Sequence, residues 1–180
     1  MKYLRRMIWY VASRLMLVCV VLGLLVTVVY YAMNLTNVYV VLKDGMARRA
    51  QVVMMEEDAS ELIKYFQTSF LERDAVLQTV EQGQSPYQDY NIRGIDHRLE
   101  MSFMWVWPWD STCRVDIVER IPAIDGRIRG SKAEAAIAAY GDDVIYPPEW
   151  QSARYRAVLS KENGQWRIKS LTLLETLQED

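Results

Sequence analysis

The chain has 180 residues, of which 51% are hydrophobic and 24% charged, with a formal net charge of −2 at pH 7. Leu15 to Met33 is a run of 19 residues without a charge, so only the 147 residues from Asn34 to Asp180 are left to fold in water, which suits one domain rather than two. Four of the 21 Lys and Arg residues precede this run, so 17 remain against 23 Asp and Glu in residues 34–180, and this net charge of −6 argues against nucleic acid as a partner.

The apolar run at 15–33 predicts a transmembrane helix. Nineteen residues at ~1.5 Å per residue span ~28 Å, close to the ~30 Å hydrocarbon core of a bilayer. A cleaved signal peptide is the alternative, but its apolar region has only ~7 to 15 residues, and Tyr30-Tyr31-Ala32-Met33 is not a small-x-small cleavage site. We therefore expect an uncleaved anchor.

Charges on the two sides of this run predict its orientation. No basic residue follows it before Lys43, whereas four precede it: Lys2, Arg5, Arg6 and Arg14. Because basic segments stay in the cytoplasm, residues 1–14 should form a cytosolic tail and residues 34–180 an extracytoplasmic domain at the cell membrane. Aromatic residues that favour the headgroup zones lie towards the two ends of the predicted span: Trp9 and Tyr10 at one end, Tyr30 and Tyr31 at the other.

One face of the predicted span carries small residues four positions apart, namely Cys19, Gly23 and Thr27. Small residues at this spacing let two membrane helices approach closely. The row suggests a homo-oligomer as one arrangement of the chain.

Two helices are predicted after the span. Apolar residues recur at near-helical spacing from Val38 to Met55, and Gly45 is expected to interrupt or bend this helix. Asp58 and Glu61 have the spacing of a capping box, which predicts a second helix reaching Phe70. The Gly-, Gln- and Ser-containing segment 82–90 then ends the helical part.

Strands are predicted next. Along 97–107 the apolar residues alternate with polar ones, so one face should be buried: Leu99, Met101, Phe103, Trp105 and Trp107. A returning strand is expected over 113–121, giving a long hairpin.

The C-terminal part predicts a short helix and a second hairpin. Ser131 and Glu134 have capping-box spacing, and Gly141 is well placed to end an Ala-rich helix. The pair Asn163-Gly164 predicts a tight turn between strands at 153–160 and 165–174.

Helices followed by a curved antiparallel sheet, with the pattern Tyr155-x-Ala157-x-Leu159 and then Asn163-Gly164-Gln165-Trp166-Arg167-Ile168, resemble the cone-shaped, nuclear-transport-factor-like α+β fold over residues 38–176. The resemblance implies two or three helices packed on a mainly antiparallel sheet of about four strands. With a single N-terminal anchor, the architecture is also similar to the bitopic scaffold subunits of bacterial conjugation and type IV secretion systems. No residue role carries over from that likeness.

A catalytic site would have to use His97, the chain's single histidine. Asp96, Tyr87 and Tyr90 are its neighbours in sequence. Adjacent strand residues point to opposite faces, so Asp96 can orient His97 only if a bulge, for example at Gly94, changes the alternation. One His and two separated Cys cannot supply an ordinary zinc site, and we expect no cofactor.

Tryptophans are the other candidate functional residues. We place Trp105 in the core and regard Trp107, Trp109 and Trp150 as candidate interface positions, because aromatic rings give a large contact area at low entropic cost. They would serve a protein partner or, alternatively, an envelope glycan.

These observations favour a non-enzymatic scaffold or assembly domain outside the bacterial cytoplasmic membrane, whose partners are other membrane or envelope proteins. Two alternatives stay open: a ligand-binding or catalytic cone with a pocket near His97, and a glycan-binding surface module.

Overall fold

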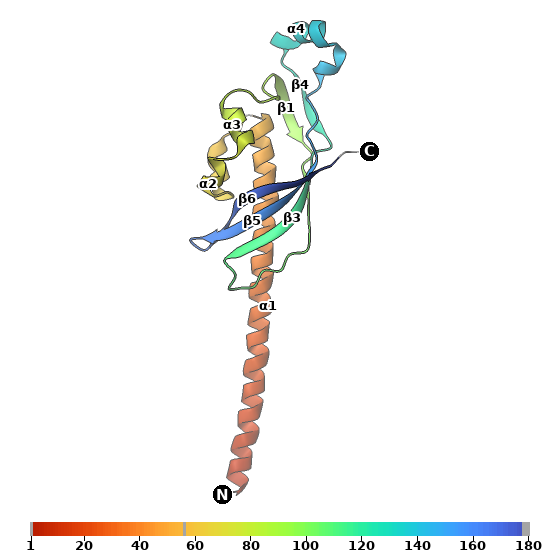
Figure 1. The fold of residues 1–180 in the computed structure, drawn as a ribbon. Helices are drawn as coiled ribbons and strands as arrows, with labels where there is room; N and C mark the ends of the chain where they lie inside the picture. Colours follow the sequence, from red (N-terminus) through yellow and green to blue (C-terminus); the bar gives the residue numbers. More distant parts are fainter. Residues whose placement is uncertain (1, 56, 178–180) are drawn as a thin grey trace.

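Helix α1 (Lys2–Met55) runs without interruption for 54 residues in the computed structural model, which describes residues 2–55 and 57–177 (Figure 1). Met1 of the predicted tail and residues 178–180 of the predicted domain lie outside the described residues. The N-terminal part of α1 stands clear of the other elements, and it contains the apolar stretch that is long enough to cross a membrane, none of it buried in the protein. The chain thus has a long apolar helix followed by an α+β domain.

Gly45 does not interrupt α1, so of the predicted interruption or bend the interruption is wrong. A Cβ atom at this position would lie 2.9 Å from Cβ of Tyr65 and 3.2 Å from Cδ1 of Ile168. The glycine instead lets the helix approach the following segment and the sheet closely.

The single helix predicted for 58–70 is also wrong. The chain forms three short helices: η1 (Ala59–Lys64), α2 (Thr68–Leu71) and α3 (Ala75–Glu81). Asp58 does cap the first of them, since its carboxylate accepts a hydrogen bond from the Ser60 amide at 2.8 Å. The helical pattern then stops because backbone groups of Tyr65 and Gln67 bond to Ile168 of the sheet, at 2.7 and 2.9 Å.

Four antiparallel strands make the main sheet, in the order β2 (Arg98–Met101), β3 (Thr112–Arg120), β5 (Ala153–Glu162) and β6 (Gln165–Thr176). The predicted α+β class and sheet are therefore confirmed. Asn163 and Gly164 form the expected two-residue turn, both with positive φ (51° and 81°).

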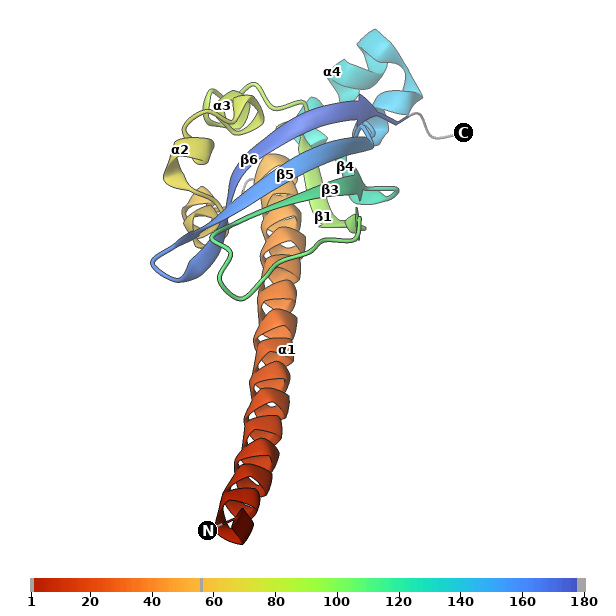
Figure 2. The ribbon, with the colours of Figure 1, turned by 60° about the horizontal axis from the view of Figure 1, so that its bottom comes forward.

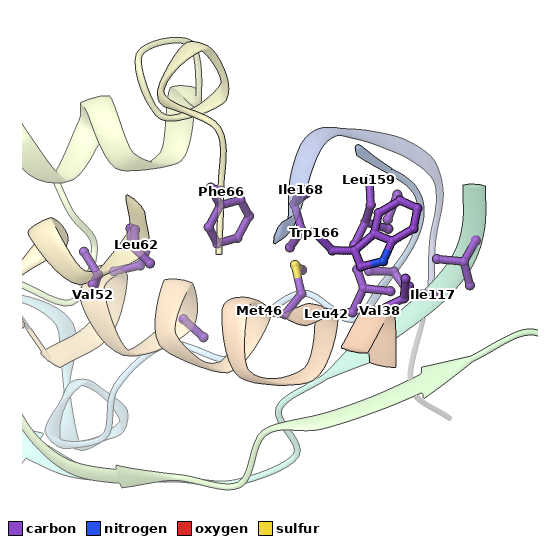
Figure 3. Packing of buried hydrophobic residues seen from close by; sticks show 14 of the residues in the cluster. Val38, Leu42, Met46, Val52, Leu62, Phe66, Ile117, Leu159, Trp166 and Ile168 are labelled. Atoms are coloured by element: carbon purple, nitrogen blue, oxygen red, sulfur yellow. The ribbon is translucent and has the colours of Figure 1, made fainter. Parts of the chain in front are cut away.

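Helix α1 packs across one face of this sheet (Figures 1 and 2). Residues at helical spacing on α1 meet sheet residues in an interior that Figure 3 shows filled with side chains. The fully buried residues shown there include Val38, Leu42, Met46, Phe66, Ile117, Leu159 and Ile168.

A second, two-stranded sheet was not predicted. β1 (Tyr90–Ile95) pairs with β4 (Ile124–Ile128), with a register shift between Ile92 and Gly94. The chain continues into helix α4 (Gly130–Tyr140), close to the predicted 131–141, and into η2 (Asp142–Ile145). Ser131 lies within α4 and Arg129 is its N-cap, so the proposed capping box does not form. We call β1, β4 and α4 the arm; it lies at the end of the molecule opposite the N-terminus of α1 (Figure 1).

Candidate functional site

Two buried pairs of polar side chains occupy the interior between α1, the short helices and the sheet. Arg49 on α1 holds Asp74, the N-cap of α3, through two hydrogen bonds of 2.6 and 3.1 Å. Nε2 of His97 lies 3.0 Å from Oε1 of Glu119 on β3, and these side chains are 7% and 0% exposed. We call these four residues the polar centre.

The acidic residues of the polar centre stabilise the positive charge of Arg49. Burial by itself lowers the pKa of Arg49, but the hydrogen bond and charge of Asp74, with a further contribution from Glu119, outweigh it and raise that pKa. Tyr155 on β5 lies within the same field, and burial raises the pKa of its hydroxyl. The guanidinium is thus held charged in an interior that excludes water.

The partner of His97 was missed by sequence reasoning, which found no orienting group. The signal was present, because the inward positions of β3 are 113, 115, 117 and 119, and Glu119 is the one charged residue among them. Asp96 pairs instead with Arg98 at 2.6 Å on the surface. The Asp96 carboxylate is thus engaged by Arg98, and the group beside His97 is Glu119.

The other two residues proposed beside His97 serve different parts of the fold. The Tyr87 hydroxyl donates to the Glu149 carbonyl at 3.5 Å, and burial raises its pKa to about 12. The Tyr90 hydroxyl donates to the Val144 carbonyl at 3.1 Å. Both tyrosines thus bind the connection after α4 rather than complete a site around His97.

This arrangement gives His97 little access to a substrate. A general base must reach the proton that it removes, and the His97 ring is almost fully enclosed with its Nε2 committed to Glu119. A hollow of about 280 Å³ lies beside Tyr87, Trp150 and Tyr155, but His97 does not line it. Among the described residues, no group of three or more His, Cys, Asp or Glu lies close enough to bind a metal ion.

Residues 102–111, which we call the aromatic loop, differ most from expectation. Strand β2 ends at Met101, and from there the alternation reverses, so that Met104 and Val106 are buried. Trp105, predicted to be in the core, is 55% exposed, and Phe103 and Trp109 are 82% and 71% exposed. The predicted long hairpin is therefore only four residue pairs long, because the aromatic loop leaves the sheet.

The aromatic loop leaves the sheet to follow α1. Asn34 donates a hydrogen bond from Nδ2 to the Trp107 carbonyl at 3.0 Å. The ring of Tyr31 lies 5.1 Å from that of Trp105 and 6.3 Å from that of Trp107, between centroids. Of the predicted interface residues, Trp107 and Trp109 are exposed here, whereas Trp150 is half-buried and stacks on Tyr87.

The arm carries a polar groove of about 650 Å³ that is lined by residues of β1, β4 and the start of α4. Its exposed lining includes Asn91, Arg93, Asp125 and Arg127, with Arg129 at the start of α4. Three guanidinium groups against one carboxylate give this groove a basic lining within an acidic domain.

The small residues of α1 lie on its free part. Cys19 is exposed, no atom of the described chain would contact a Cβ at Gly23, and the Thr27 hydroxyl donates to the Gly23 carbonyl at 2.9 Å. This face is open to a second helix.

The chain matches no protein-family model, and comparisons with curated proteins and with solved structures found no significant match. The resemblances to the cone-shaped fold and to secretion-system scaffolds are therefore proposals.

Proposed function

We propose that this protein is a membrane-anchored extracytoplasmic scaffold or assembly domain that acts through protein–protein contacts, with its N-terminus in the cytoplasm of a bacterium. The charge asymmetry around residues 15–33 supports the orientation. The element order of helix and antiparallel sheet, with the Asn163-Gly164 hairpin, supports the likeness to bitopic scaffold subunits of conjugation and type IV secretion systems.

The observation that carries this proposal is the filled interior. Ligand-binding and catalytic domains keep an apolar pocket with polar groups directed into it. Here the space between α1 and the sheet is occupied by fully buried side chains such as Met46, Phe66 and Ile168, and the side chains of the polar centre pair with one another. The polar groups that line the groove on the arm are, by contrast, open to a partner.

The basic groove of the arm suits an acidic segment of an envelope protein. Arginine recognises carboxylates through paired hydrogen bonds, and Arg93 and Arg127 both present exposed side chains in this groove. An anchored domain meets such partners at a raised effective concentration, because both are confined to one surface.

Site-specific photocrosslinking in cells that make the protein tests this function. p-Benzoylphenylalanine replaces Asn91 in the groove and, as the control position, exposed Thr172 on β6. We expect discrete protein adducts from position 91 that disappear when Arg93→Glu/Arg127→Glu is added. Lys169→Glu/Arg114→Glu is the matched control, since it makes the same charge change at exposed positions away from the groove and should leave the adducts in place.

An absence of adducts at position 91, or adducts that persist after charge reversal in the groove, would count against a protein-contact role for the arm. Adducts at position 172 alone would move the contact surface to β6.

Orientation needs a separate test. In a Cys19→Ala background, a membrane-impermeant maleimide should label Ser131→Cys on the arm in intact spheroplasts, and Ser13→Cys only after lysis. The reverse pattern would overturn the proposed topology.

A further inference from the structure

Contacts with α1 set the position of the aromatic loop along the helix axis, and therefore its height relative to the predicted membrane span. Its contacts with α1 fall on Tyr31 and Asn34, on either side of Met33, where the apolar run ends. Because α1 continues without a break from this run into the core at Val38, no flexible linker separates the loop from the span. If residues 15–33 cross the bilayer, Trp105 and Trp107 lie at the level of the outer headgroups.

Internal contacts of the aromatic loop hold its rings outward. Met104 and Val106 point into the core. Asp110 accepts a hydrogen bond from the Trp107 amide at 2.7 Å, and its own amide donates to the Trp107 carbonyl at 3.1 Å, which closes a tight turn. The rings of Trp107 and Trp109 stack with centroids 5.1 Å apart and planes within 8°.

Such an exposed aromatic cluster is unfavourable in water. Each large aromatic side chain offers ~150–250 Å² of surface, so Phe103, Trp105 and Trp109 together leave a contiguous apolar patch of a size that marks an interaction site. Tryptophan favours the zone between hydrocarbon and water, where its ring is shielded and its N–H can still find an acceptor. Lys161 lies beside the loop, with Nζ 3.5 Å from the Pro108 carbonyl, and offers a positive charge to lipid phosphates.

We propose that the aromatic loop inserts into the headgroup zone of the bilayer that α1 spans. This contact gives the domain a second attachment beside its helix and fixes its orientation on the membrane. The arm is then held at the far end from the lipid, where it is free for partners (Figure 1). The inference goes beyond the proposed scaffold function and rests only on α1 as a transmembrane helix.

Depth-dependent fluorescence quenching of the full-length protein in proteoliposomes tests this proposal. A Trp9→Phe/Trp150→Phe background leaves the loop tryptophans and buried Trp166. We expect phosphatidylcholine brominated near the headgroups to lower the emission about twofold, and lipid brominated deep in the chains to lower it less, as for rings in the interfacial zone. Adding Trp105→Ser/Trp107→Ser/Trp109→Ser should remove most of this quenching, because Trp166 is enclosed.

Two further measurements keep the result decisive. In the triple-serine variant, Leu24→Trp places a reporter in the middle of the apolar run, and deep bromines should quench it; failure here overturns the premise that α1 spans. Trp109→Cys labelled with bimane, in a Cys19→Ala background, reports on the loop when the other rings are intact, and doxyl lipid should quench it.

Loop emission that resists bromolipid but is quenched by aqueous acrylamide would place the rings in water and overturn the proposal. So would emission that changes only when soluble envelope glycan is added, which would assign the loop to glycan instead.

Discussion

Nε2 of His97 lies 3.0 Å from Oε1 of Glu119, and this contact joins the connection between β1 and β2 to the end of β3. Both side chains are removed from water, so each depends on the other for its polar partner. The chain's single histidine thereby holds the arm's ribbon against the main sheet. We infer a structural role for it rather than a catalytic one.

Replacing His97 with Leu should lower the free energy of unfolding by about 3–5 kcal/mol, because it leaves a buried carboxylate without a partner. The double variant His97→Leu/Glu119→Met should be less destabilised than the sum of the single changes, since it removes both polar groups. Urea unfolding of the full-length protein in detergent, followed by near-UV circular dichroism, measures both values. Strictly additive losses would show that the two residues do not depend on each other.

Arg49→Lys should lower the free energy of unfolding by about 1–3 kcal/mol, because a lysine cannot reproduce the two hydrogen bonds that the guanidinium donates to Asp74. Arg48→Lys is the matched control at the adjacent position, where the side chain is partly exposed and pairs with Glu57 and Glu61. Its cost should be below about 1 kcal/mol. If urea unfolding gave the same loss of unfolding free energy for both variants, the buried pair of Arg49 and Asp74 would contribute no more to stability than the partly exposed pairs of Arg48.

Gly45→Ala is expected to destabilise the domain, although alanine by itself favours a helix over glycine by about 1 kcal/mol. The added Cβ would lie 2.9 Å from Cβ of Tyr65, whose own Cβ cannot move without the backbone. We expect a net loss of about 1–3 kcal/mol in thermal or urea unfolding. Gly94→Ala, where a Cβ would meet nothing within 4 Å, should be close to neutral. A stabilised Gly45→Ala would contradict the tight helix–sheet approach.

The Cys113 thiol should react slowly. Burial, with a contribution from Asp110, raises its pKa from 9.0 to about 11, so at pH 8 it has about a hundredfold less thiolate than an ordinary cysteine. In Cys19→Ala, alkylation with iodoacetamide should therefore be at least about a hundredfold slower than in a Cys19→Ala/Cys113→Ala/Ser111→Cys variant, whose thiol is exposed. Rapid modification, or a dimer linked through Cys113, would contradict this expectation.

Acid should weaken the contact between β3 and β5. The hydrogen bond from Arg156 lowers the pKa of Asp116. The folded protein thus releases this proton at lower pH than the unfolded chain, so the stabilisation is complete above the unfolded pKa and is lost as pH falls through the lowered one. Arg156→Gln should shift acid unfolding to higher pH, whereas Arg114→Gln, an exposed change on β3, should not. Coincident acid transitions for the two variants would refute the assignment.

Local sequence patterns correctly predicted the elements whose conformation depends only on residues nearby in the sequence. The charge-free run in α1, the alternation in β3 and the Asn163-Gly164 turn each correspond to what forms. Part of the polar centre could also have been predicted from the sequence, since Glu119 occupies an inward position of its strand. Its partner His97 was not, because the pairing depends on how the connection after β1 folds back onto β3.

The sequence by itself determined an apolar N-terminal helix, an α+β domain and a hairpin, because hydrophobic periodicity, charge and turn chemistry act within a few residues. Tertiary structure decided the conformation of the two segments whose hydrophobic periodicity predicted a different one. Backbone bonds from Tyr65 and Gln67 to Ile168 divided a predicted helix into short ones, and contact with Tyr31 and Asn34 drew the aromatic loop off the sheet. In both places, partners more than sixty residues away supply hydrogen bonds and packing that outweigh the local preference.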